Sequence, residues 1–132
     1  MPNYLRNQVL AAVTLIFLTS SHGALAQDAA PDALRGKRLF LRCASCHQIS
    51  DRAAPKTGPN LRGIVGRQVG SAPGYAYSPA LRALHFTWDE AMLDRWLTNP
   101  TSVTRGTTMA FAGLSRARDR KALIAYLKAA SQ

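Results

Sequence analysis

The chain has 132 residues, of which 47% are hydrophobic and 18% are charged, which fits one small folded domain and excludes a largely disordered chain. Its formal net charge is +10, and the basic residues are scattered without a dense block. No recognition helix, zinc module or aromatic stacking motif accompanies this charge. We therefore predict no nucleic-acid partner and expect contact with acidic protein faces or, transiently, with an anionic membrane surface.

Residues 1–26 predict a secretory signal peptide. Arg6 precedes the uncharged apolar run 9–18, and Ala24-Leu25-Ala26 has the small residues of a signal-peptidase site. The apolar run is about half of the roughly 20 residues that a membrane-spanning helix needs, which disfavours the alternative of a retained anchor. We expect cleavage after Ala26, one mature domain at 27–132, and a periplasmic location.

The segment after Pro31 predicts the first helix of that domain. Ala33, Gly36, Phe40 and Cys43 recur at helical spacing and mark one face. A glycine inside a helix costs about 1 kcal/mol relative to alanine. Gly36 therefore suggests that another stretch of backbone packs closely against the helix at this point.

Glycine and proline are so frequent in residues 50–80 that no long helix or strand is expected there. Ser78 followed by Pro79 predicts the start of a short helix that runs to about Leu84. Thr87-Trp88-Asp89-Glu90 has the form of a capping box and predicts a helix that continues to Thr98.

The sequence Asn99-Pro100 is expected to end that helix, and 101–113 is expected to be an irregular loop. A final helix should begin after Ser115, which can cap it, with Leu123, Leu127 and Ala130 on one face. No convincing strand pattern appears, so the predicted fold class is all-α. The long irregular segment at 50–80 is unusual in so small a domain and suggests a chain wrapped around a bound group.

Both cysteines of the chain lie in one motif, Cys43-Ala44-Ser45-Cys46-His47. This spacing is used for covalent haem attachment, in which two thiols add to the vinyl groups and the adjacent imidazole binds iron. A disulfide or free dithiol is the structural alternative that an exported chain permits. A thioredoxin-like site would need a βαβ pattern, and zinc would need a fourth ligand. We predict one covalently attached haem c.

The second axial position on the iron has several candidates: His85, Met92, Met109 or no residue. Met109 falls in the predicted loop 101–113, which is able to reach over a porphyrin. Met92 falls inside a predicted helix and is expected to fill the core, and His85 is expected at the surface. A methionine thioether favours ferrous iron, whereas an open position would invite oxygen or peroxide chemistry.

These motifs resemble the small soluble c-type cytochromes related to mitochondrial cytochrome c and its bacterial electron-carrier relatives. The resemblance covers nearly all of the predicted domain and implies the cytochrome c fold, in which short helices and long loops surround one haem and the N- and C-terminal helices cross. Its points of agreement are Gly36 and Phe40, CASCH at 43–47, TGPNLRGIVGRQVG at 57–70, APGYAYSPAL at 72–81, Trp88, Asn99-Pro100, GTTMAFAGL at 106–114 and LIAYLK at 123–128.

The resemblance also implies roles for individual residues. Cys43 and Cys46 would form the thioether bonds, and His47 and Met109 would be the axial iron ligands. The carbonyl of Pro59 would accept the N–H of the His47 imidazole. The other residues with an implied part in haem binding are Arg67, Tyr77 and Trp88, which would hold a propionate, Trp96, which would pack on the haem, and Thr107 in the loop that contains Met109. Gly36 and Phe40 would meet the last helix near Leu123 and Tyr126.

Several positions depart from the usual pattern of the resembled family. Arg105 and Thr108 stand where a proline and a lysine are common in the loop that contains Met109. Trp96 stands where a tyrosine hydroxyl commonly approaches the methionine sulfur, and Leu81 replaces a frequent asparagine. We expect these changes to make the haem surroundings more apolar and to alter the stability of the loop and the reduction potential.

The function implied by the resemblance is a monohaem electron carrier that cycles between Fe(II) and Fe(III), and not an enzyme. It would be a monomer that passes electrons between a reductase or dehydrogenase and an oxidase. Two alternatives stay open at this stage. One is a haem peroxidase or gas-binding protein in which Met109 dissociates, and the other is an electron-accepting subunit dedicated to one dehydrogenase.

Overall fold

The computed structural model describes residues 29–51 and 54–130 of the chain, so the predicted signal peptide at 1–26 lies outside the described residues. The helices of the described part are, in chain order, α1 (Ala29–Phe40), α2 (Pro79–Arg82), α3 (Glu90–Thr98), α4 (Pro100–Val103) and α5 (Ala117–Ala129). An isolated antiparallel bridge joins Gln68 to Thr87. The predicted all-α class is confirmed. Within the described ranges, no helix is long and apolar enough to cross a bilayer.

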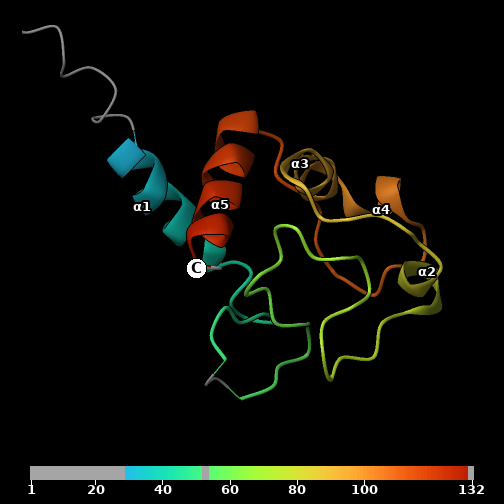
Figure 1. Cartoon of the computed structure of the whole chain (residues 1–132). Coiled ribbons are helices and arrows are strands. Elements are labelled where there is room, and N and C mark those ends of the chain that lie inside the picture. Colours follow the sequence, from blue (N-terminus) through green and yellow to red (C-terminus); the bar gives the residue numbers. More distant parts are fainter. Residues whose placement is uncertain (1–28, 52–53, 131–132) are drawn as a thin grey trace, which may run out of the picture.

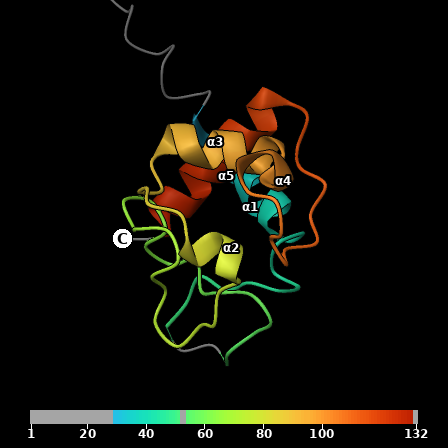
Figure 2. The same ribbon diagram turned by 90° about the vertical axis from the view of Figure 1, so that its right-hand side faces the viewer.

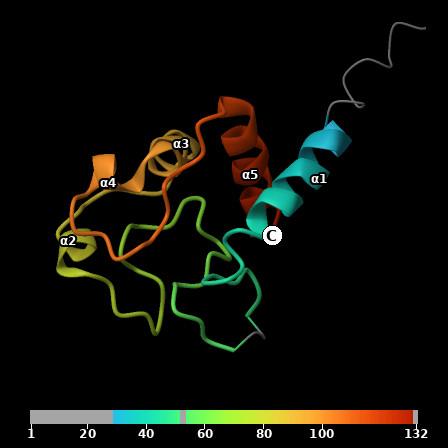
Figure 3. The ribbon, with the colours of Figure 1, turned by 180° about the vertical axis from the view of Figure 1, so that it is seen from behind.

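Helices α1 and α5 cross in direct contact, which the front and back views of the molecule both show (Figures 1 and 3). A methyl group built on Gly36 would lie 2.2 Å from the carbonyl oxygen of Ala122 and 2.7 Å from the Cβ of Tyr126. The rings of Phe40 and Tyr126 pack beside this crossing with their centroids 5.5 Å apart. The close approach of another backbone that Gly36 predicts is therefore present, and it is the backbone of α5.

Charged side chains tie α5 to the other long helices. The guanidinium of Arg35 in α1 donates to Asp119 in α5 over 2.6 Å. Arg120 of α5 donates to Asp94 of α3 over 2.7 Å and, through another nitrogen, to the carbonyl oxygen of Leu114 over 2.9 Å. Only 11% of the Arg120 side chain is exposed, so this interaction is screened less by solvent than an ordinary surface pair.

Helix α2 begins as predicted, and Ser78 accepts a hydrogen bond from the backbone N–H of Leu81 over 3.3 Å. It ends at Arg82, earlier than the predicted Leu84. Helix α3 ends at Thr98 as expected, but its N-cap is Asp89 and not the first residue of the predicted capping box. The Asp89 carboxylate accepts from the N–H of Met92 over 2.6 Å, a short charge-assisted bond that a threonine hydroxyl does not provide.

Two expectations about the C-terminal third were wrong. Residues 101–113 are not irregular throughout, because Pro100 starts the short helix α4, with the side chain of Asn99 accepting from the N–H of Thr101 over 3.1 Å. Proline at a first helical position starts a helix as readily as it ends the preceding one. The N-cap of α5 is Arg116 and not Ser115, and no side chain caps it.

The loop between α4 and α5 is anchored against α3 at its end. Gly113 has φ +99°, and a Cβ there would lie 2.0 Å from the carbonyl oxygen of Thr98. Directly beyond it, the N–H of Leu114 donates to the carbonyl of Leu97 over 2.7 Å. Seen from the side, most of the helical structure gathers at one end of the molecule and the irregular segment between α1 and α2 occupies the other (Figure 2). The space between these two parts holds the candidate site.

Candidate functional site

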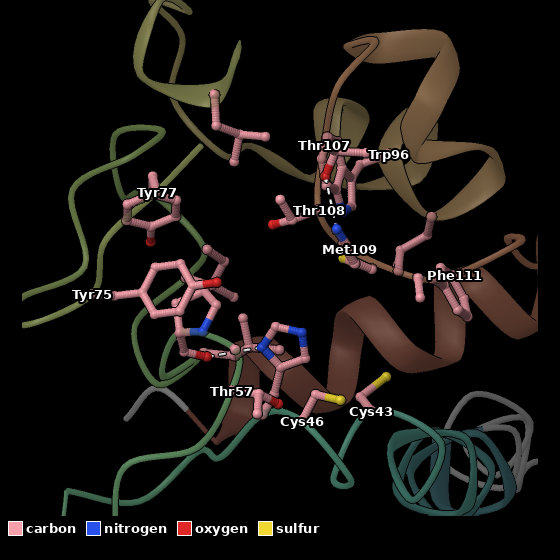
Figure 4. Close-up of a pocket in the computed structure, with 18 of the residues that line it drawn as sticks. Cys43, Cys46, Thr57, Tyr75, Tyr77, Trp96, Thr107, Thr108, Met109 and Phe111 are labelled. Carbon is pink, nitrogen blue, oxygen red and sulfur yellow. Dashed lines mark hydrogen bonds between the residues drawn. The ribbon is translucent and has the colours of Figure 1, made fainter. Parts of the chain in front are cut away.

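A cavity of about 390 Å³ lies between the irregular segment and the helices. Its walls combine the turn after α1, residues 57–61, α3, the α4–α5 loop and α5. Most of the lining is apolar, and the apolar residues deepest in the fold are Ile64, Leu81, Trp88, Leu93, Trp96, Leu97, Leu123 and Leu127. Figure 4 shows Cys43 and Cys46 at one side of this space and Met109 with Thr107 at the other.

Both thiols reach the cavity because the chain continues in helical turns beyond α1. The N–H of Cys43 donates to the carbonyl of Phe40 and the N–H of His47 to that of Cys43, each over 2.8 Å. Burial raises the pKa of the Cys43 thiol. Hydrogen bonds from Thr57 and Ser45 lower the pKa of the exposed Cys46 thiol. The motif therefore presents two free thiols and one imidazole to the same space.

The His47 ring is held in one orientation by the segment that follows it. Its Nδ1 lies 2.8 Å from the carbonyl oxygen of Pro59. A carbonyl only accepts, so Nδ1 carries the proton. Burial lowers the pKa of the imidazole, which favours the neutral ring. A neutral ring protonated at Nδ1 leaves the Nε2 lone pair available to bind a metal, and the Pro59 carbonyl increases its basicity.

Gly58 permits this packing of the imidazole. A Cβ on Gly58 would lie 2.6 Å from Cε1 and 2.8 Å from Nδ1 of the His47 ring. Any larger residue would have to displace the ring or the carbonyl of Cys46, whose oxygen would lie 2.9 Å from the added Cβ. Sequence reasoning did not single out Gly58 as a site residue, because its spacing from His47 gives no sign of the contact. The one sequence feature that could have indicated Gly58 as a site residue was its position in TGPN, which belongs to the stretch 57–70 that carries the resemblance.

Met109 lines the cavity from the α4–α5 loop, and its backbone is fixed locally. Its N–H donates to the hydroxyl of Thr107 over 3.2 Å, and its carbonyl accepts from the N–H of Phe111 over 3.1 Å. The thioether is half-buried beside the core. The other two ligand candidates do not line the cavity: Met92 packs against the core from α3, and His85 is exposed.

Trp88 and Trp96 form the apolar back of the site. Both are buried, and their rings meet edge to face with centroids 5.2 Å apart. Tyr77 lines the cavity as well, with its ring edge to face against Tyr75 at 4.7 Å. Its hydroxyl accepts from the N–H of Ala72 over 3.3 Å, and burial raises the pKa of the phenol. These tyrosines place hydroxyl groups at a wall that is otherwise largely apolar.

The structure does not bring Arg67 into the cavity lining. Its guanidinium donates to the carbonyl oxygens of Asn60 over 2.8 Å and Arg62 over 3.1 Å. It remains close enough to Tyr77 for its charge to act against the rise in the pKa of that phenol. The role in holding a propionate that the resemblance implies for Arg67 stays a prediction, and the structure gives this side chain backbone partners instead.

Arg42 and Phe111 also line the cavity, although neither was a predicted site residue. The guanidinium carbon of Arg42 lies 6.0 Å from the centroid of the Phe111 ring, which joins the cysteine-bearing turn to the α4–α5 loop. The two residues are far apart in the sequence, and only the fold places them together. No local motif could have indicated the pair.

The donor set fits the haem c that the CASCH motif predicts. Two thiols can form thioether bonds to a planar apolar group, and an Nε2 lone pair from the same turn can bind a metal at its centre. A thioether across the cavity supplies a soft donor of the kind that favours Fe(II). The remaining wall is mostly hydrocarbon, which suits the faces of a porphyrin.

Residues 33–131 match the family model described as cytochrome c. The chain is 44% identical over 99 residues to cytochrome c2 of Rhodomicrobium vannielii, covering 75% of this chain and 79% of that protein. It is 44% identical over 104 residues to cytochrome c of Gossypium barbadense, covering 77% and 94%. Among solved structures, cytochrome cH from Methylobacterium extorquens matches with a TM-score of 0.69 and 40% identity, covering 74% of this chain and 98% of that one. The matched region contains every element that lines the cavity.

Proposed function

Because this chain belongs to the cytochrome c family, we propose that it is an electron carrier whose single haem is bound axially by His47 and Met109. The chain carries one covalently bound haem c, and its two cysteines, Cys43 and Cys46, are the residues that can form the thioether bonds. The observation that carries the axial proposal is the arrangement of donors: a neutral imidazole with a free Nε2 and a thioether line the same cavity, the imidazole from the cysteine-bearing turn and the thioether from the α4–α5 loop.

The haem supplies the one-electron Fe(II)/Fe(III) couple. The work of the polypeptide is to hold it and to set the stability of its two states. Pro59 orients the His47 ring and makes Nε2 a better donor, and the thioether of Met109 favours the reduced state. The buried indoles of Trp88 and Trp96 exclude water and leave the extra charge of the oxidised state poorly solvated. If His47 and Met109 bind the iron as proposed, no position on it is left open for a substrate.

Acidic faces of redox proteins are the proposed partners, because the formal net charge of the chain is +10. Opposite charges speed the encounter of two proteins, and salt screens them over about 8 Å at physiological ionic strength. We expect the rate of electron transfer to an acidic partner protein to fall as salt is raised, measured by stopped-flow absorbance. The reaction with a small uncharged reductant is the control and should not change. A protein reaction insensitive to salt would contradict this proposal.

We also propose that the carrier works in the periplasm. The support is the form of residues 1–26, with Arg6, an apolar run and Ala24-Leu25-Ala26 as a cleavage site. The N-terminal residue of the protein purified from a haem-attaching bacterial periplasm tests this directly. Gln27 at the N-terminus is the expected result.

The visible spectrum of the same purified protein, oxidised and then reduced, tests the axial ligands. We expect a c-type spectrum together with the weak long-wavelength band of methionine-bound ferric haem. A c-type spectrum without that band would remove Met109 from the proposal while leaving the covalent haem in place. Protein without haem would contradict the attachment through Cys43 and Cys46.

A further inference from the structure

The α4–α5 loop is hydrogen-bonded at both ends, and residues in its middle line the cavity. At one end, the N–H of the buried Thr104 donates to the carbonyl of Pro100 over 3.1 Å. At the other end, Leu114 is bonded to Leu97 of α3. Residues 105–112, called the methionine loop here, lie between these anchors and contain Met109. Whether Met109 stays over the cavity depends on what holds the middle of this loop.

Arg42 contacts the middle of the methionine loop from a fixed base. Its N–H donates to the carbonyl of Leu39 over 3.1 Å, and its carbonyl accepts from the hydroxyl of Ser45 over 3.4 Å. The guanidinium carbon lies 6.0 Å from the centroid of the Phe111 ring, at the outer limit of a cation–π interaction. No carboxylate of the described residues forms an ion pair with this guanidinium. Its charge is therefore available to the ring.

Phe111 passes this restraint to Met109. The two residues are separated by one position, and the N–H of Phe111 donates to the carbonyl of Met109 over 3.1 Å. Figure 4 shows Phe111 beside Met109, on the side of the cavity nearer Cys43. Because of this bond, a displacement of the Phe111 backbone away from Arg42 would also displace the carbonyl of Met109.

We propose that Arg42 is a positioning residue for Met109, and that its guanidinium over the Phe111 ring holds the methionine loop closed against the cysteine-bearing turn. The imidazole-binding test below rests on the proposed ligation by Met109, whereas the hydrogen-exchange test does not. A cation–π pair at an exposed site is worth about 0.5–1 kcal/mol, which corresponds to a roughly two- to five-fold change in the population of the open loop.

The first test measures amide hydrogen exchange in the haem-loaded protein. Arg42→Met keeps an unbranched stem of similar length and removes the charge. We expect exchange at the N–H groups of Met109 and Phe111 to become roughly two- to five-fold faster. Arg42→Lys, which keeps a cation, should show a smaller increase. Arg38→Met is the matched control, because it removes the same charge from an exposed residue of α1 that does not line the cavity. Equal exchange in Arg42→Met and Arg38→Met would overturn the proposal.

The second test measures binding of imidazole to the ferric protein, which requires the methionine to leave the iron. The rate should rise by the same factor in Arg42→Met. Phe111→Leu removes the ring, so adding Arg42→Met to it should have no further effect. If Arg42→Met raised the rate equally in the wild type and in Phe111→Leu, the proposed pairing of Arg42 with the Phe111 ring would be overturned.

The two tests separate failure of this proposal from failure of the proposed ligation. Faster loop exchange in Arg42→Met, combined with immediate imidazole binding by the wild type, would keep the role of Arg42 and remove Met109 as a ligand. If the wild type shows the methionine band but loop exchange is unchanged in Arg42→Met, Met109 stays as the ligand and the role of Arg42 is removed.

Discussion

Replacing Met109 by alanine is expected to leave the haem attached through Cys43 and Cys46 while opening the iron to added ligands. The methionine is the one ligand that the α4–α5 loop supplies in the proposed site, and the thioether bonds do not depend on it. The long-wavelength band of the ferric protein should disappear. Cyanide should bind at least tenfold faster. A tenfold change corresponds to about 1.4 kcal/mol, so even a weak coordinate bond from Met109 would produce it when lost. Absorbance of the ferric protein after rapid mixing measures both effects.

Met92→Ala is the matched control for that experiment. Met92 is also half-buried, but it packs against the core from α3 and does not line the cavity. Its loss should lower stability by about 2–5 kcal/mol at most, as for a methionine truncated in a core. It should leave the ferric band and the slow cyanide reaction intact. Identical spectra for wild type and Met109→Ala would show that another residue, or none, fills the position.

Gly36→Ala should destabilise the protein, although alanine is a better helix former than glycine. Helix propensity alone would stabilise the variant by about 1 kcal/mol. The added methyl would, however, lie 2.2 Å from the carbonyl oxygen of Ala122, and a helix backbone cannot yield locally at small cost. We expect a net loss of about 1–3 kcal/mol, the usual cost of overpacking. Guanidinium unfolding of the haem-loaded protein measures it.

The control for Gly36→Ala is Ala33→Val, which adds bulk to an exposed position of the same helix. Its effect should stay within about 0.5 kcal/mol, as for other surface substitutions. A stabilised Gly36→Ala variant would mean that α1 and α5 do not approach as closely as the structure indicates. The sign of the change, and not only its size, therefore decides the question.

The features that sequence reasoning predicted correctly are those with a local cause. Gly36 lowers the stability of its own helix relative to alanine. This penalty can be read from the sequence, so a close neighbour is predicted before that neighbour is known. Ser78 and Pro79 start α2 through a cap and a fixed φ that both lie within one turn. The helix that ends at Thr98 is bounded by Asn99-Pro100, which no α-helix continues through easily.

The errors arose where two local solutions compete. Thr87 and Asp89 are both good caps, and the shorter bond of a carboxylate favours Asp89. Ser115 is a good cap by type, yet the helix begins one residue later, where the carbonyls of Leu114 and Ser115 are both bonded to the guanidinium of Arg120. A contact made by a side chain of α5 itself thus favours a helix start one residue later than the type of Ser115 predicts.

The residues of the candidate site also fall into those with a local cause and those that depend on distant segments. The CASCH motif by itself places its donor groups near one another, because the two thiols and the imidazole of His47 come from consecutive turns. The contact of Gly58 with the imidazole and that of Arg42 with Phe111 depend on how distant segments fold together. Such contacts leave no periodic or spacing signal in a single sequence. They become visible only when the structure places both partners.

The crossing of α1 and α5 has a consequence for the order of events during synthesis. These are the first and last helices that the structure describes, and α5 supplies Leu123 and Leu127 to the cavity wall. A growing polypeptide that has exposed Cys43 and Cys46 therefore still lacks the helix that completes their surroundings. The thiols emerge reactive and accessible long before the native packing can enclose them. The thioether bonds can thus form on an open chain, before α5 is in place to complete the cavity wall.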